Sequence, residues 1–239
     1  MSRAGGRLLL LFTKPAREGR VKTRLIGDLS AAQAAELHGA FLADMLDRLG
    51  GGGFDLRLAW AVEPGEELPA APFPGVRQEG VDLGERLYGA LAEAAGQASA
   101  VAALGSDHPT VGLDLIYRAF AAVEAGAEVV LGPAEDGGYY LIALAAGAVS
   151  RRLFAGIAWS TSRVLAQTLE RCRELGLAVE LLPLGCDVDT PADLARLAGQ
   201  LAAADLGCPR TRALLGRWQL LPVPAPEPAS HRQADRCAS

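Results

Sequence analysis

Short apolar runs that alternate with longer amphipathic stretches constrain this fold more than any other feature of the chain. Residues 7–13 form a nearly continuous apolar run, as expected for a central parallel strand that is buried on both faces. Later runs of strand character lie at 54–62, 99–104, 128–131, 139–144 and 178–182. The alternation predicts an α/β fold, in which a mostly parallel central sheet is flanked by helices.

Helix start signals support the same interpretation. Ser30 and Gln33 form a capping box at the start of one amphipathic stretch, and Thr190 can cap a helix whose first residue is Pro191. Stretches with helical spacing lie at 30–49, 82–97, 113–125, from about 160 and from 191. The segment 63–75 is rich in Pro, Gly and Glu, which predicts an exposed loop.

Length and charge limit the kind of protein. The chain has 239 residues, which fits one large α/β domain, predicted here over residues 1–220. Residues 221–239 are rich in Pro and Ala without periodicity, which predicts a disordered tail. A net charge of -5 argues against a nucleic-acid partner. The apolar run 8–12 is too short to span a membrane, and the four cysteines are scattered. We therefore expect reduced thiols in a cytoplasmic protein.

In an open parallel sheet, ligands bind beyond the carboxyl ends of the strands, so polar segments that follow strands deserve a close look. The first such segment, 13–25, holds five basic residues and one acid within an acidic chain. It suits a polyphosphate, although a solvated charged loop is the plain alternative. The candidate phosphate-binding residues are Thr13, Lys14, Arg17, Lys22 and Arg24.

Carboxylates follow two further predicted strands. Asp107 lies directly after the strand at 99–104, where its oxygens could hold a divalent metal. Asp187 and Asp189 stand two residues apart, so both side chains would point to one side of an extended segment. The alternatives are an ordinary turn at Asp107 and a helix cap at Asp189. His108 could be a metal ligand, but a lone His is more often structural.

Two more segments are candidates for substrate contacts. Gly137 and Gly138, next to Asp136, permit close approach of a ligand to the backbone, and a hairpin turn is the compatible alternative. Asp82, Glu85 and Arg86 stand at the start of a predicted helix and could contact a nucleotide or acceptor, whereas simple capping by Asp82 is the alternative.

Taken in order, these segments resemble the signature blocks of the bacterial DUF2064 family. The matching blocks are KTRL at 22–25, DLGER at 82–86, GSDHP at 105–109, GPAEDGGY at 132–139 and DVDT at 187–190. Members are often labelled glycosyltransferases, or transferases associated with radical-SAM and selenium-domain genes. The resemblance covers residues 8–197 and implies a Rossmann-like GT-A fold of the nucleotide-diphospho-sugar transferase superfamily. His108 departs from the expected small polar residue, so no catalytic role carries over to it.

The resemblance implies a transferase that uses a nucleotide and a small-molecule acceptor. Edge strands and apolar helix faces could in addition support a homodimer. Asp107, with Asp187 or Asp189, would hold Mg²⁺ or Mn²⁺. Lys22 and Arg24 would neutralise charge during catalysis, and Asp136 would orient the acceptor or act as a base.

The superfamily contains two chemistries. The basic loop is similar to that of nucleotidyltransferases, including phospholactate guanylyltransferases with their Lys-x-Arg-Leu sequence, which favours nucleotidyl transfer from a nucleoside triphosphate. Glycosyl transfer from a nucleotide-diphospho-sugar is the alternative. A non-catalytic nucleotide-binding regulator on the same fold is the second alternative.

Overall fold

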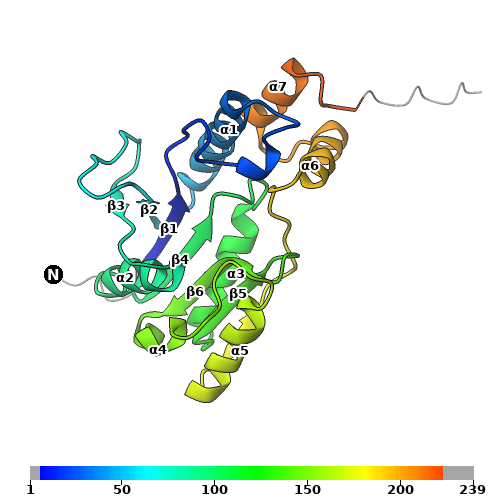
Figure 1. Cartoon of the computed structure of the whole chain (residues 1–239). Coiled ribbons are helices and arrows are strands. Elements are labelled where there is room, and N and C mark those ends of the chain that lie inside the picture. The colour runs from blue at the N-terminus through cyan, green and yellow to red at the C-terminus, as the bar shows by residue number, and fades with distance from the viewer. Residues whose placement is uncertain (1–5, 223–239) are drawn as a thin grey trace, which may run out of the picture.

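A seven-stranded sheet forms the centre of the computed structural model, which describes residues 6–222 (Figure 1). The strand order is β3-β2-β1-β4-β6-β5-β7, and β6 is antiparallel to both of its neighbours. The remaining strands run parallel to one another, so their carboxyl ends meet at one edge. The strands are β1 (Arg7–Thr13), β2 (Asp55–Trp60), β3 (Gly75–Arg77), β4 (Ala100–Gly105), β5 (Val129–Pro133), β6 (Tyr139–Ala145) and β7 (Val179–Leu181).

Helices cover both faces of this sheet (Figure 1). Leu9 and Leu11 of β1 face the side packed by α1 and α3, whereas Leu8 and Leu10 face the side packed by α2, α4 and α5. Burial on both faces explains the continuous apolar run of β1. The helices are α1 (Ala31–Leu49), α2 (Leu83–Ala95), α3 (Leu113–Glu124), α4 (Arg151–Phe154), α5 (Val164–Leu175), α6 (Pro191–Ala203) and α7 (Pro209–Arg217), with short 3₁₀ turns η1 (Thr23–Leu25) and η2 (Ala146–Ala148).

The last two helices pack together on the outer side of α1 and form a third apolar cluster with it. A buried carboxylate anchors α7 there. Asp44 of α1 accepts hydrogen bonds from the Thr211 backbone N–H at 2.8 Å, the Thr211 hydroxyl at 2.7 Å and the Arg210 N–H at 3.0 Å. Because these amides belong to the first turn of α7, Asp44 caps that helix from a distant part of the chain.

Most elements lie where the sequence predicts them, and the exceptions are short or irregular. Both predicted helix caps are present, with Ser30 bonded to the Gln33 amide and Thr190 to the Asp193 amide. Three elements, β3, α4 and α7, are not predicted by the sequence. The helix expected near Ser160 begins at Val164, because Ser160 has a left-handed backbone (φ 60°) that no helix interior accepts.

Two expectations concern the whole chain. Of the tail predicted at 221–239, residues 223–239 lie outside the described part of the structure. Within residues 6–222 the cysteines Cys172, Cys186 and Cys208 form no disulfide, and their reduced state stays a prediction. Over the same residues, no helix combines the length and the apolar character that crossing a membrane requires.

Candidate functional site

The loops after β1, β4 and β5 come together with residues 185–189 at the carboxyl-end edge of the sheet. Gly185 donates its backbone N–H to Pro133 at the end of β5 (2.8 Å), and Val188 donates to the carbonyl of Asp107 after β4 (2.9 Å). These two bonds place Asp187 and Asp189 beside Asp107, because β4 and β7 are parallel and end at the same edge of the sheet although β6 and β5 lie between them.

Lys22 occupies the centre of this arrangement. Its ammonium donates to the Val188 carbonyl at 2.8 Å and to Asp189 at 3.2 Å, and it forms an ion pair with Asp107. The side chain is only 1% exposed, and Nζ lies 5.5 Å from the centre of the Phe41 ring. Lys22 therefore joins the β1–α1 loop to both carboxylates and is not a freely exposed phosphate ligand.

The backbone of Lys22 is also unusual. It has φ 47° and ψ 39°, the left-handed conformation that a residue with a side chain seldom adopts. Such a conformation costs free energy and persists only where surrounding contacts over-determine it. The buried ammonium with its three oxygen partners supplies those contacts.

The surroundings shift the pKa values of Asp107 and Asp187 in opposite directions. Burial, together with the negative charges of Asp107 and Asp189, raises the pKa of Asp187 to about 7. Burial also opposes ionisation of Asp107, but the neighbouring Lys22 ammonium outweighs it and holds the pKa of Asp107 below its ordinary value. Two carboxylates thus contact one ammonium and a third, Asp187, lies near them, so the uncompensated negative charge acts most strongly on Asp187.

This excess of carboxylate oxygen fits a hard divalent cation such as Mg²⁺ or Mn²⁺. The protein alone does not form a complete site, however. Within residues 6–222, no three His, Cys, Asp or Glu side chains lie close enough together to hold a metal ion. The residues therefore suit the mode in which one or two carboxylates and the phosphate oxygens of a substrate share the ion.

The rest of the basic loop surrounds this cluster at the surface. Lys14, Arg20 and Arg24 are exposed, and no ion pair among the described residues involves them. Arg17 instead pairs with Glu66. The side chain of Thr13 is buried, and its hydroxyl lies 3.3 Å from Nε2 of His38. Lys14 and Arg24 thus keep the exposure that a phosphate ligand needs.

His38 is a neighbour of the site that the sequence analysis did not single out. Nε2 of this buried α1 residue lies 3.0 Å from the carbonyl oxygen of Lys14, so His38 contacts the backbone of the basic loop from the protein interior. Burial lowers the pKa of His38, against an opposing effect of the nearby Asp107. Its only sequence signal is its place on the inner face of a helix, where a His normally has a structural role.

The turn between β5 and β6 carries Asp136, Gly137 and Gly138. Asp136 accepts the Gly138 N–H at 2.8 Å, and Gly137 has φ 86°. A Cβ atom at Gly137 would overlap the Ser162 carbonyl, and Leu165 donates its N–H to the Gly137 carbonyl at 2.9 Å. The glycine is required both for the turn and for contact with the segment before α5. Asp136 is close enough to contribute to the raised pKa of Asp187.

The start of α2 is stabilised by local bonds. Asp82 caps the helix by accepting the Glu85 N–H at 2.9 Å, Glu85 accepts the Val81 N–H at 3.1 Å, and Arg86 donates to the Gly80 carbonyl at 3.1 Å. No hydrogen bond or ion pair in the described part of the chain links these residues to the carboxylate cluster. The capping alternative is therefore present, and a nucleotide contact stays a prediction.

His108 points away from Asp107 and packs edge-on against the Tyr140 ring, with the ring centres 4.8 Å apart. Burial, and to a smaller extent Arg48, lowers the pKa of His108 to about 4, so the imidazole is neutral at physiological pH. The geometry gives His108 no contact with the carboxylate cluster.

Comparison with known proteins places the chain in a family. Residues 50–161 match the family model described as an uncharacterized protein conserved in bacteria (DUF2064). A solved structure from Desulfovibrio desulfuricans G20 is 32% identical, with 92% of this chain and 97% of that chain covered and a TM-score of 0.85. The chain belongs to the DUF2064 family. The Desulfovibrio protein is provisionally named a nucleotide-diphospho-sugar transferase.

More distant structures share the fold of this DUF2064 protein. A cytidylyltransferase from Leptospira borgpetersenii is 11% identical and has a TM-score of 0.54, with 92% of this chain and 97% of that chain covered. Rv0371c from Mycobacterium tuberculosis H37Rv is 20% identical and has a TM-score of 0.51, with 81% and 97% covered. No curated protein matches the sequence. These likenesses confirm the predicted α/β architecture.

Proposed function

We propose that this DUF2064 protein is a metal-dependent transferase with a nucleotide as one substrate. The observation that carries the proposal is the cluster of Asp107, Asp187 and Asp189 around the buried Lys22. The cluster lies at the edge of the sheet where open α/β proteins bind ligands, and an exposed basic loop borders it. The provisional name of the Desulfovibrio relative supports the same class of reaction.

The carboxylates of Asp107 and either Asp187 or Asp189 would hold Mg²⁺ or Mn²⁺ together with phosphate oxygens of the nucleotide. When bound, the ion would neutralise negative charge on those oxygens.

The chain's own residues have distinct parts in this proposal. Lys22 keeps Asp107 and Asp189 at a fixed separation, since its ammonium contacts both. The exposed Lys14 and Arg24 supply positive charge for the phosphates. Asp136, next to a rigid glycine turn, would orient the acceptor or accept its proton.

We favour nucleotidyl transfer from a nucleoside triphosphate. A triphosphate carries more negative charge than a nucleotide sugar, and it makes better use of the exposed cations of the basic loop, Lys14, Arg20 and Arg24. Glycosyl transfer from a nucleotide-diphospho-sugar is the second candidate, because the Desulfovibrio protein, which is 32% identical to this chain, is named for that substrate class.

Ligand binding and product analysis distinguish the two reactions. The full-length protein is screened by thermal shift with Mg²⁺ or Mn²⁺ and either nucleoside triphosphates or nucleotide-diphospho-sugars. A ligand at a hundredfold excess over its dissociation constant should stabilise the native state by about 2.7 kcal/mol. Release of pyrophosphate from a triphosphate in the presence of acceptor supports nucleotidyl transfer. Release of a nucleoside diphosphate from a nucleotide sugar supports the second candidate, and binding without turnover supports a regulator.

The role of the carboxylates has its own test. Asp107→Ala should abolish metal-dependent turnover and leave the fold intact, because the side chain is 48% exposed and lies outside the core. Asp28→Ala, which removes an exposed carboxylate after the same basic loop, is the matched control and should keep full activity. Full activity in a folded Asp107→Ala protein would exclude the proposed metal site.

A further inference from the structure

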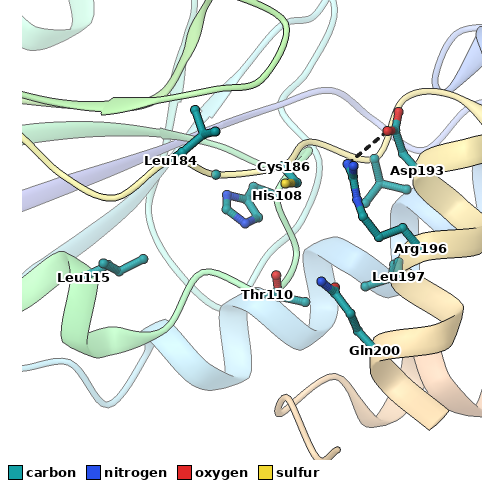
Figure 2. Close-up of a pocket in the computed structure, with 11 residues that line it drawn as sticks. His108, Thr110, Leu115, Leu184, Cys186, Asp193, Arg196, Leu197 and Gln200 are labelled. Atoms are coloured by element: carbon teal, nitrogen blue, oxygen red, sulfur yellow. Dashed lines mark hydrogen bonds and ion pairs between the residues drawn. The ribbon is translucent and has the colours of Figure 1, made fainter. Parts of the chain in front are cut away.

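A separate pocket of about 220 Å³ lies between α6 and the two segments that follow β4 and β7. Figure 2 shows His108 and Thr110 from the first segment, Cys186 from the second, and Gln200 from α6 around one hollow. The carboxylates of Asp107, Asp187 and Asp189 do not line it.

The pocket and the carboxylate cluster lie on opposite sides of the same two segments. Residues 186–189 lie outside helices and turns, and successive side chains of such an extended segment point in opposite directions. His108 faces the pocket while Asp107 faces Lys22, and Cys186 and Val188 line the pocket while Asp189 contacts Lys22. The pocket is therefore a second site, distinct from the proposed nucleotide site.

Its hydrogen-bonding groups suit hydroxyls. The Thr110 hydroxyl and the Gln200 amide can each both donate and accept a hydrogen bond, and the His108 imidazole adds two ring nitrogens. The Nδ1 atom of His108 is buried and has no partner among the described residues. Unsatisfied buried polar atoms are rare in native proteins and call for an explanation, such as a ligand or an ordered water.

The charges at the pocket wall argue against an ionic ligand. Arg196 is the cation on this wall, and it is already bonded to Glu135 at 2.9 Å and to Asp193 at 3.0 Å. An anion would find no unpaired positive charge there, and the carboxylate on this wall, Asp193, is already bonded to Arg196 and Thr190 and is not free for a cation.

We propose that this pocket binds a small uncharged polyol. A hydroxyl both donates and accepts, which matches the pocket's own groups, and the carbon skeleton of a polyol suits the apolar wall of Leu115 and Leu197. The volume equals that of about seven water molecules, which fits a polyol of roughly four to six carbons.

The experiment maps binding on the full-length ¹⁵N-labelled protein, with erythritol and glucose added separately as probes. Wild type should show saturable shift changes at the amides of Thr110 and Cys186 for at least one probe. Gln200→Trp places a bulky ring on the exposed α6 position that lines the pocket, and binding should weaken by about tenfold or more. Ala195→Trp, on an exposed position of α6 outside the pocket, is the matched control and should bind like wild type.

Thermal unfolding first establishes that both variants are folded. Three results would overturn the proposal: no saturable change with either probe, equal binding by Gln200→Trp and wild type, or changes centred on the basic loop and the start of α2. Each of these is independent of whether the protein transfers a nucleotide.

Discussion

Asp187 is the side chain whose ionisation the surrounding structure opposes most clearly. Its pKa is raised from an ordinary 3.8 to about 7 by burial and by the charges of Asp107 and Asp189. Between these two pH values the folded state binds more protons at Asp187 than the unfolded state does. The contribution of Asp187 to the free energy of unfolding therefore falls as pH rises from about 4 to 7, and it stays low above pH 7.

We expect Asp187→Asn to stabilise the metal-free protein increasingly as pH rises across this range. The amide copies the protonated carboxyl, so little should change near pH 4. Because water screens part of the charge at this half-buried position, we expect a gain of about 1–2 kcal/mol at pH 8. Urea unfolding of wild type and variant in chelator at pH 4, 6 and 8 measures the difference. A gain that is the same at every pH would contradict the raised pKa.

Lys22 and Arg24 allow a matched comparison of two cations in one loop. Lys22→Met leaves Asp107 and Asp189 without their shared ammonium, and we expect a loss of about 1–3 kcal/mol in the free energy of unfolding. Arg24→Met removes an exposed cation and should change stability by less than about 0.5 kcal/mol. Urea denaturation of both variants tests this. Equal effects would mean that the buried ion pairs contribute nothing.

At this scale the sequence predicts the meeting of Asp107, Asp187 and Asp189, because the carboxyl ends of parallel strands share one edge. It does not predict that Lys22 is buried among them. A lysine in a charged loop is normally expected to be exposed. The left-handed backbone conformation that turns Lys22 inward cannot be recognised from the sequence, because the residue is not a glycine. The inward packing of His38 is equally invisible without the tertiary fold.

Among the elements, the β5–β6 turn depends on a contact with the segment before α5. Gly137→Ala should cost about 3 kcal/mol or more, because the added methyl combines a positive φ with overlap of the Ser162 carbonyl. Gly126→Ala, where φ is 114° and the space is open, isolates the backbone effect and should cost about 1–2 kcal/mol. Chemical denaturation measures the loss in the free energy of unfolding for both variants. Similar losses would show that the segment around Ser162 moves aside at little cost.

Elements with local signals are predictable, and those that depend on distant partners are not. The helices α1 and α6 carry capping boxes in their own sequence. By contrast, β3 has three residues, too few for any alternation to be seen, and it forms by pairing with β2. The start of α7 is capped by Asp44, which lies 167 residues earlier than Thr211.

On the scale of the whole molecule, that distant cap ties the end of the described chain to α1. Asp44→Ala removes the partner of two backbone amides and a hydroxyl, and we expect a loss of about 2–4 kcal/mol with faster hydrogen exchange in α7. Asp47→Ala, which removes an exposed ion pair to Arg210, should cost less than about 1 kcal/mol. Hydrogen-exchange mass spectrometry compares the exchange rates of α7 amides in the two variants. Unchanged exchange in α7 of Asp44→Ala would contradict the anchoring of α7 by Asp44.

The α/β class follows from the alternation of strand-like and helical stretches, but the strand order does not. The reversed direction of β6 relative to β5 follows from the short connection 134–138, because a parallel pair would need a crossover of about a dozen residues or more, but the pairing of β6 with β4 depends on the finished sheet. The apolar residues of short strands such as β5 and β6 do not indicate which further strand each one pairs with.

The reversal of β6 also limits how members of such a fold can diversify. At the end of every parallel strand the chain leaves the sheet at the ligand-binding edge, and the loops that follow these strands can become longer. At β6 the chain enters the sheet from that edge after only five residues, 134–138, and the glycine turn within them is locked against the segment before α5. New specificity at this corner must therefore come from exchanging side chains, whereas the corners after β1 and β4 can also gain or lose residues.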